Sequence, residues 1–171
     1  MPRKKANYYQ TALESWNEGL SRLGESIVHF QRIEEVLSLC IIAMLGRDRT
    51  LGEIVTSELS FRAKVGVYSA LFLYRSRLPK LPEDVSEVLG RVRAAEQRRN
   101  TIVHSLWDAS VKDPTMIKRE KRSCGKSGLS KVLEHIHPSE LEDDIKDFEN
   151  VAEDLWYVTD QHLPKESNRF K

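Results

Sequence analysis

The sequence is poor in several features whose scarcity narrows the class of protein. Only two of the 171 residues are cysteines, Cys40 and Cys124, which is too few for a disulfide framework. The longest apolar run, around Leu39 to Leu45, is far too short to cross a membrane. Lys and Arg number 27 against 26 Asp and Glu, so neither sign of charge dominates. These scarcities exclude a disulfide-stapled scaffold, and the net charge by itself does not indicate nucleic acid.

The N-terminal sequence also lacks the apolar stretch of a signal peptide. Pro2-Arg3-Lys4-Lys5 is followed by polar residues, so we expect a cytoplasmic protein with no membrane contact. The length suits one domain with a full core. We expect a single domain at 10–163, a basic flexible tail at 1–9 and a C-terminal tail at 164–171.

What the sequence does contain is helical periodicity. From Leu13 to Met44 apolar residues recur at steps of three or four, which predicts a helix. The pattern leaves open whether this is one helix or two that meet near Gly24. The apolar positions are Leu13, Trp16, Leu20, Leu23, Ile27, Phe30, Ile33, Leu37, Ile41 and Met44.

Capping residues divide the rest of the chain into further helices. Thr50 with Glu53 predicts a capping box and a short helix to about Ser57, and Ser60 is the expected N-cap of a helix ending near residue 78. Pro82 begins the next helix, and Pro138 with Ser139 opens the last one. Leu141, Ile145, Phe148, Val151, Leu155 and Val158 form the expected buried face of that last helix.

Between the last two helices the helical pattern stops. Residues 105–111 and 116–122 have the character of short strands, and 123–128 is rich in Gly and Ser. We interpret 105–135 as a hairpin or an ordered loop. The expected fold class is therefore all-α, an antiparallel helical bundle with a short hairpin or ordered loop before its last helix.

Polar residues interrupt the apolar stripe near the end of the helix that begins at Pro82. Successive helical residues are about 100° apart, so Val85, Val88, Leu89 and Val92 share one face, to which Val103 returns. Glu96 and Arg99 fall on this face, Asn100 and His104 at its edge, and Arg98 on the opposite, solvent side. Charge on a buried face is costly unless it is paired or used.

Two interpretations of these residues remain open. Glu96 and Arg99 are three residues apart, a spacing that suits a structural ion pair. His104 near a helix C-terminus is favoured there in its cationic form without any catalytic role. Alternatively, Arg99, Asn100 and His104 form a functional site with Glu96 supporting Arg99.

The stretch Arg99-Asn100-x3-His104 resembles the Arg-polar-x3-His signature of HEPN domains. The resemblance extends over roughly residues 20–163. It implies a HEPN-like helical bundle with the signature late in one helix, and in many members a metal-independent ribonuclease that works as a dimer. It further implies a toxin or phage-defence role, with an antitoxin or another regulatory protein as a partner.

A basic segment follows the motif. Residues 112–131 hold seven Lys and Arg against two acids, whereas residues 140–154 hold eight acids against one Lys. Lys and Arg neutralise phosphates without reading sequence, so this segment is the expected RNA-binding surface, unless it is only a solvated loop. Its predicted RNA-binding residues are Lys118, Arg119, Lys121, Arg122 and Lys126.

The sequence offers no convincing metal or cofactor site. Cys124, His135 and His137 lack a CxxC pair and a fourth ligand at the usual spacing. Gly125-Lys126-Ser127 resembles the end of a phosphate-binding loop, but Glu120 stands where the first glycine is needed. We therefore expect no metal and no cofactor.

Two functions from different classes follow. The first is a metal-independent endoribonuclease, in which His104 moves protons, Arg99 stabilises the phosphate charge and Asn100 orients either group. One His per chain is few for both acid and base, so we expect a homodimer through the motif helix. The second is a non-catalytic helical module that binds nucleic acid, a nucleotide or a protein partner.

Overall fold

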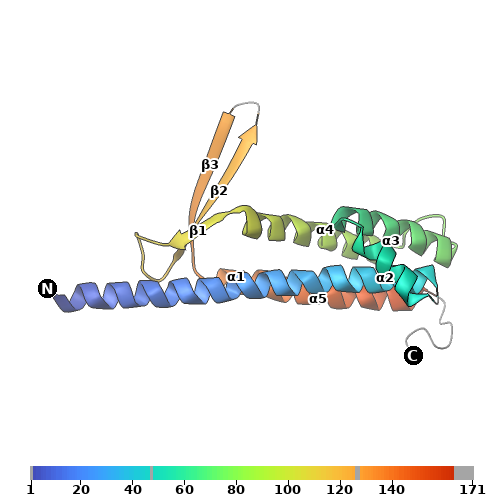
Figure 1. The fold of residues 1–171 in the computed structure, drawn as a ribbon, viewed down its shortest axis with the longest axis horizontal. Coiled ribbons are helices and arrows are strands. Elements are labelled where there is room, and N and C mark those ends of the chain that lie inside the picture. The colour runs from blue at the N-terminus through green and yellow to red at the C-terminus, as the bar shows by residue number, and fades with distance from the viewer. Residues whose placement is uncertain (1, 47, 126–127, 164–171) are drawn as a thin grey trace. The chain divides into compact units, whose positions relative to one another are not determined.

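The computed structural model describes residues 2–46, 48–125 and 128–163, with side chains from Asn7 onward. It contains both helices and a sheet (Figure 1), so the all-α prediction is wrong. The expected C-terminal tail at 164–171 lies outside the described residues. The elements are α1 (Pro2–Leu45), α2 (Arg49–Ser57), α3 (Phe61–Ser76), α4 (Glu83–His104), β1 (Leu106–Ala109), β2 (Ile117–Gly125), β3 (Gly128–Ile136) and α5 (Glu140–His162).

The elements form two compact units. Unit 1 comprises residues 1–29 and 96–147, and unit 2 comprises residues 30–95 and 148–171. Helices α1, α4 and α5 each contribute one segment to unit 1 and one to unit 2. The motif residues and the sheet belong to unit 1.

Helix α1 is continuous through Gly24, which settles the question of one helix or two. It begins at Pro2, so residues 2–9, where we expected a flexible basic tail, belong to the helix. A single glycine inside a long helix lowers its propensity but does not break it. Gly46, with a positive φ of 127°, follows the last residue of α1, as expected for a C-terminal glycine.

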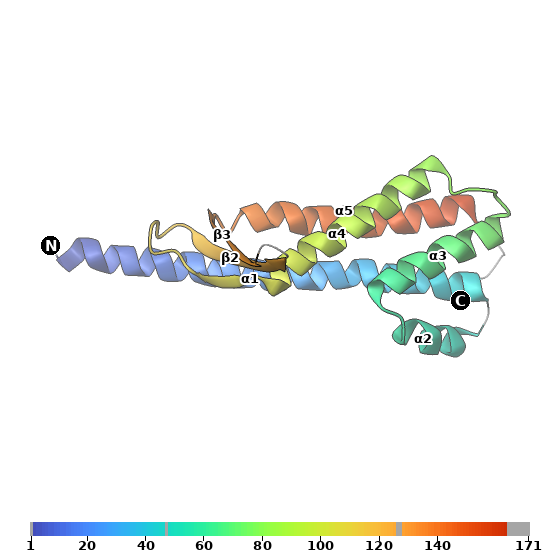
Figure 2. The same cartoon turned by 90° about the horizontal axis from the view of Figure 1, so that it is seen from above.

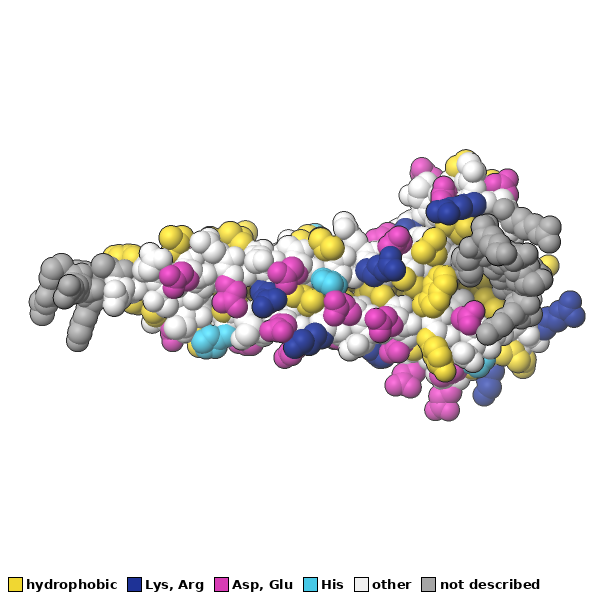
Figure 3. Space-filling model, turned by 90° about the horizontal axis from the view of Figure 1, so that it is seen from below, with side chains coloured by type: hydrophobic (Ala, Val, Ile, Leu, Met, Phe, Trp, Pro, Cys, Tyr) yellow, Lys and Arg dark blue, Asp and Glu magenta, His cyan; other side chains and the backbone are white. Residues whose placement is uncertain are grey.

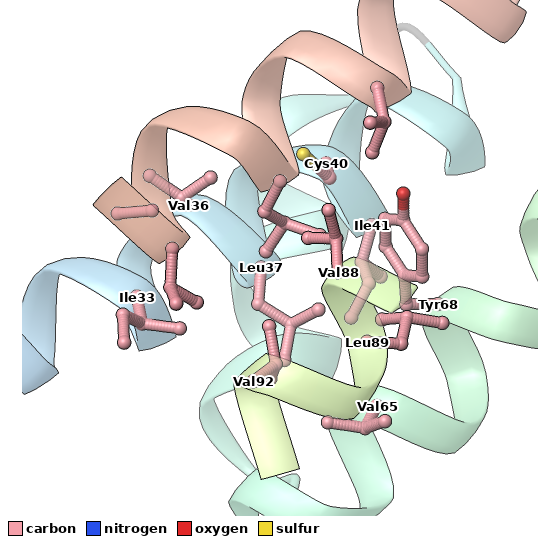
Figure 4. Packing of buried hydrophobic residues seen from close by; sticks show 14 of the residues in the cluster. Ile33, Val36, Leu37, Cys40, Ile41, Val65, Tyr68, Val88, Leu89 and Val92 are labelled. Atoms are coloured by element: carbon pink, nitrogen blue, oxygen red, sulfur yellow. The ribbon is translucent and has the colours of Figure 1, made fainter. Parts of the chain in front are cut away.

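The core of unit 2 is apolar and draws on four helices. Ile33 and Leu37 of α1, Tyr68 of α3, and Leu89 of α4 pack together with no more than 1% of each side chain exposed (Figure 4). The predicted stripe of α4 is confirmed here, because Val85, Val88, Leu89 and Val92 are all buried. From α5, the residues Phe148, Val151, Leu155 and Val158 complete this core, as predicted.

Short local features fix the ends of the helices in unit 2. Asp48, rather than Thr50, caps α2, and its carboxylate accepts a hydrogen bond from the Leu51 amide at 2.9 Å. Ser60 caps α3 as predicted. Helix α2 lies beside the end of α1 (Figure 2), and Gly52 permits this because an added Cβ there would lie 2.9 Å from Ile42.

Unit 1 has a much smaller core built between helices and a sheet. Its buried apolar residues are Leu23, Ile102, Ile117, Ile136 and Leu141, with Trp16 and Trp107 packed against them. The three strands are antiparallel in the order β1-β2-β3. The expected pairing of 105–111 with 116–122 is confirmed, since Ala109 is opposite Ile117. The third strand was missed because its glycine-flanked start was interpreted as loop.

The β2–β3 hairpin extends beyond the short strand β1 as a two-stranded ribbon (Figure 1). β1 pairs only with Ile117–Glu120, whereas β3 pairs with β2 from Ile117 to Gly125. Side chains of the distal part, from Lys121 on in β2, are exposed. In the described part of the chain no helix combines the length and the apolar character that a membrane span requires.

Candidate functional site

The buried face of α4 changes direction before the motif. In unit 1 the helix buries Ile102, which is 3% exposed, whereas the neighbouring Val103 is 45% exposed. Neighbouring helical residues lie about 100° apart, so the face expected to run from Val85 to Val103 has turned by roughly that angle. The predicted positions of Glu96, Arg98 and Arg99 relative to the core shift accordingly.

Arg98 shows the consequence most clearly. We expected it on the solvent side, but it is half-buried and pairs with two carboxylates of α5, which corrects the helical phase. Its Nε lies 3.2 Å from Asp144 Oδ1, and its Nη2 hydrogen-bonds to Asp147. Burial raises the pKa of Asp144, while the positive charge of Arg98 opposes that rise. Arg98 is therefore part of the structure that joins α4 to α5 within unit 1.

Arg99 and Asn100 are brought together at the surface of α4. Both are half-buried, and Arg99 Nη1 donates a hydrogen bond to Asn100 Oδ1 at 3.0 Å. Glu96 is half-buried too. The expected ion pair of Glu96 with Arg99, and its support of Arg99, stay predictions.

His104 is the last residue of α4 and is exposed. Within the described residues its imidazole has no hydrogen-bond partner. The chain leaves the helix here because Trp107 Nε1 donates to the Ile102 carbonyl at 2.8 Å and Ser105 Oγ donates to the Thr101 carbonyl at 2.6 Å. These bonds satisfy carbonyls at the helix end and hold β1 close to it. His104 is therefore an accessible base on an anchored segment.

Together these residues form one polar edge. Asn100 and His104 are four residues apart, so their Cβ atoms are neighbours on the helix surface, about 5–6 Å apart. Arg99 reaches this edge through its hydrogen bond to Asn100. Val103, exposed beside them, is the only apolar side chain among residues 99–104 that is exposed. A cation, an amide and an imidazole thus lie within the last turns of α4, where Arg99 and Asn100 are half-buried and His104 is exposed.

The predicted RNA-binding residues do not share one surface. They lie on strand β2, whose side chains alternate between the two faces of the sheet. Arg119 and Lys121 lie on the face that carries Ile117, and Lys118 and Arg122 lie on the other face. Lys126 lies outside the described residues.

Three of these four described cations are held by carboxylates. Lys118 hydrogen-bonds to Asp108 at 3.0 Å and Arg122 to Glu120 at 2.6 Å, and each bond lowers the pKa of its carboxyl. Arg119 donates to Glu134 at 2.7 Å and lies 5.7 Å from the centre of the Trp107 ring. Lys121 forms no ion pair with a described residue. Of the four predicted residues that the structure describes, Lys118, Arg119 and Arg122 are therefore paired and Lys121 is not.

The residues weighed as zinc ligands are separated by the same strand register. Cys124 is opposite Leu129, near the far end of the ribbon, whereas His135 is opposite Lys118 at its base. His135 Nδ1 instead lies 2.9 Å from the hydroxyl of Ser110. Across the described ranges, no group of three His, Cys, Asp or Glu side chains is arranged to hold a metal ion.

Sequence reasoning missed the structural role of Arg98, although a signal for it was present. Arg91 and Arg98 are seven residues apart, and so are Asp147 and Asp154. In unit 2 Arg91 pairs with Asp154 at 2.5 Å, and in unit 1 Arg98 pairs with Asp147. The two arginines of α4 and the two aspartates of α5 thus have the same spacing and opposite charge. This pattern indicates two helices that pair through these side chains. The acidic run is thus not only a solvated face.

Comparison with known proteins adds no relative. No protein-family model, no curated protein and no solved structure matches this chain.

Proposed function

We propose that the chain is a metal-independent endoribonuclease whose site is the edge formed by Arg99, Asn100 and His104. The observation that supports it is the bond of Arg99 to Asn100 beside an accessible His104 on one helix end. The HEPN resemblance assigns the same three residues to RNA cleavage. A toxin or phage-defence role, an antitoxin as regulator, and a cytoplasmic location belong to this proposal.

The chemistry uses the 2′-OH of RNA as an internal nucleophile. The 2′-oxygen forms a bond to phosphorus and loses its proton to a neutral imidazole, while the bond from phosphorus to the 5′-oxygen breaks. A protonated imidazole returns a proton to the departing 5′-oxygen. Arg99 stabilises the negative charge that develops on the phosphoryl oxygens. The products are a 2′,3′-cyclic phosphate and a 5′-hydroxyl.

This scheme needs two proton-transfer groups, and the edge offers one. A second copy of the chain supplies the other, since a two-fold dimer contributes a second His104. With one imidazole neutral and the other charged, the rate falls on both sides of a pH optimum.

The test is cleavage of a labelled RNA with and without EDTA, followed by analysis of the product ends. We expect His104→Ala and Arg99→Ala to lower the rate by about 100-fold or more, a typical loss for a proton-transfer or charge-stabilising group. His137→Ala and Arg62→Ala are matched controls, because both side chains are exposed and neither residue belongs to the edge. An RNA with a 2′-deoxy group at the cleaved position should resist.

Several results would overturn the proposal: dependence on added magnesium, equal cleavage of DNA, or equal losses in the control variants. Arg98→Ala is not a suitable control, since it removes two ion pairs to α5.

A second function is favoured by the neutralised cations of β2. Lys118, Arg119 and Arg122 are held by Asp108, Glu134 and Glu120, as expected for a structural ribbon more than for a phosphate-binding surface. The chain would then be a non-catalytic helical module. RNA left intact by the wild type, with unchanged binding by His104→Ala, would support this second function.

A further inference from the structure

Ser110, which follows β1, is the centre of a small hydrogen-bond network in unit 1. The residue is buried, at 2% exposed. Its hydroxyl oxygen accepts hydrogen bonds from the backbone amides of Lys112 and Asp113, each at 3.2 Å. The same oxygen lies 2.9 Å from Nδ1 of His135 on β3. These contacts join the turn between β1 and β2 to the third strand of the sheet.

The hydrogen-bond count at Ser110 fixes the direction of its bond to His135. A hydroxyl group has two lone pairs and one hydrogen. The amides of Lys112 and Asp113 occupy both lone pairs, so the hydroxyl donates its hydrogen to His135 Nδ1. An imidazole nitrogen that accepts a hydrogen bond carries no proton. His135 is therefore neutral in this arrangement, with its one N–H on Nε2.

The sheet around His135 offers no carboxylate to a charged imidazole. In the described part of the chain its Nε2 is buried without a hydrogen-bond partner. Lys118, directly opposite on β2, adds a like charge, and Asp108 in the same row on β1 is bonded to that lysine at 3.0 Å. Glu134 points to the other face of the sheet, where it pairs with Arg119. These surroundings disfavour the charged form of His135.

The turn beside His135 is also bonded within itself and to α1. Asp113 Oδ1 accepts hydrogen bonds from the hydroxyl and the amide of Thr115, and these bonds lower the pKa of the Asp113 carboxyl. The Tyr8 hydroxyl of α1 donates to the Val111 carbonyl at 3.0 Å. The Asp113 carboxylate is thus engaged inside the turn, and the turn links the sheet to α1.

We propose that Ser110 and His135 form a pH-sensitive switch that holds or releases the turn at residues 110–116. A proton on His135 Nδ1 points at a hydroxyl oxygen whose two lone pairs are both in use, so either the turn amides or the imidazole must move away. The closed turn binds no proton at His135 and the open turn can bind one, so falling pH favours the open turn. Imidazoles gain their proton between about pH 5 and 8. This switch stands whether or not the chain cleaves RNA.

Other titratable side chains decide the pH range of the test. Figure 3 shows acidic side chains and histidines on the surface of the molecule. Carboxyl groups ordinarily titrate near pH 4, so a comparison of about pH 5.5 with about pH 7.5 changes mainly the histidines. His137 is exposed and lies two residues beyond His135, so it is the matched control position.

The first test is NMR of the imidazole nitrogens of the full chain at about pH 7.5, where ordinary imidazoles are neutral. We expect His135 to carry its proton on Nε2 and to accept a hydrogen bond at Nδ1. Ser110→Ala should shift the Nδ1 signal of His135 and leave that of His137 unchanged. A proton on Nδ1 of His135, or a His135 signal that does not respond to Ser110→Ala, would overturn the proposal.

The second test is hydrogen exchange of the Lys112 and Asp113 amides, corrected for the intrinsic effect of pH. From about pH 7.5 to 5.5 the open turn should become at least about tenfold more populated, because each pH unit changes a proton-linked equilibrium by up to tenfold. His135→Asn supplies an oxygen that accepts the Ser110 hydrogen but takes up no proton, so it should remove this pH dependence. His137→Asn should keep it.

Ser110→Ala should leave both amides unprotected at either pH, while circular dichroism shows unchanged helix content. A wild type whose turn opens equally at both pH values contradicts the switch, whatever the variants do. The same holds if His135→Asn keeps the pH dependence or if His137→Asn removes it.

Discussion

The interiors of units 1 and 2 differ in how many buried apolar residues they contain. In unit 2 four helices meet around apolar side chains such as Leu37, Tyr68 and Phe148, none of which is exposed. In unit 1 the buried apolar residues are few, and ion pairs such as those of Arg98 with Asp144 and Asp147 also join the helices. Helix α4 contributes to both, and its buried face turns between them. The comparison teaches that helical phase read from apolar residues holds where buried apolar residues are many, as in unit 2, and fails where they are few, as in unit 1.

The largest effect is expected in the core of unit 2. Phe148 is fully buried and lies 5.8 Å from the Phe30 ring. Phe148→Ala should lower the free energy of unfolding by about 3–5 kcal/mol, through lost burial and the cavity left behind. Urea unfolding followed by circular dichroism measures this. A loss below about 1 kcal/mol would mean that unit 2 does not depend on its apolar packing.

A smaller effect is expected at the ion pairs of unit 1. Arg98→Ala removes the ion pairs to Asp144 and Asp147, and because these groups are partly exposed we expect a loss of about 1–2 kcal/mol. Arg93→Ala, at an exposed position of the same helix, should change stability by less than about 0.5 kcal/mol.

The pH dependence of this loss has a definite sign. Burial raises the pKa of Asp144, so its contribution to stability is present below its ordinary pKa and is lost as pH rises through the raised value. Arg98 offsets that loss when the carboxylate is charged. The difference between wild type and Arg98→Ala should therefore be widest at neutral pH and should narrow on acidification. A difference that does not change between neutral and acidic pH would contradict the ion-pair role.

These two units also show how much of the fold can be predicted from the sequence alone. The long α1 pattern, the stripe from Val85 to Val92 and the buried face of α5 were predictable, because period and burial coincide there. The all-α fold class was wrong because β2 is rich in Lys and Arg and neither β2 nor β3 has an apolar alternation along most of its length. The two strands pair through backbone hydrogen bonds and cross-strand ion pairs such as Arg119 with Glu134. A local sequence pattern does not predict such contacts.

The candidate site was predictable in its members but not in its geometry. Spacing indicated that Asn100 and His104 are neighbours, as they are on the helix. It did not reveal the bond of Arg99 to Asn100, nor that Arg98 faces α5, because both depend on which residues pack against α4. The role of these residues in RNA cleavage stays a prediction.

A buried hydrogen bond in unit 2 gives the next smaller effect. The Tyr68 hydroxyl lies 2.7 Å from Thr159 Oγ1, and burial raises the pKa of Tyr68 above its ordinary range. Tyr68→Phe should cost about 1 kcal/mol, since Thr159 keeps its bond to the Leu155 carbonyl. Thermal unfolding followed by circular dichroism measures this loss. In the same experiment Tyr74→Phe, at a position that is 78% exposed, should cause no measurable loss of stability. Equal losses in both variants would show that this polar contact adds nothing to the apolar core.

The smallest effect on stability is expected on the ribbon of unit 1, where Lys121 and Arg119 lie on one face. Lys121 has no ion pair with a described residue, so Lys121→Ala should change the free energy of unfolding by less than about 0.5 kcal/mol. Arg119 is held by Glu134 and packs near Trp107, so Arg119→Ala should cost more stability.

Binding to RNA should rank the two residues in the opposite order. A cation that neutralises one phosphate of a single strand contributes about 0.7 to the slope of log affinity against log salt. Lys121→Ala should therefore reduce that slope by about this amount, because its ammonium group is available to a phosphate. Arg119→Ala should leave the slope nearly unchanged, since Glu134 already neutralises its guanidinium. Fluorescence anisotropy with a labelled single-stranded RNA at several salt concentrations measures both slopes. If Arg119→Ala changes the slope and Lys121→Ala does not, the ion pairs of the ribbon open on binding, and the contrast drawn between paired and unpaired cations fails.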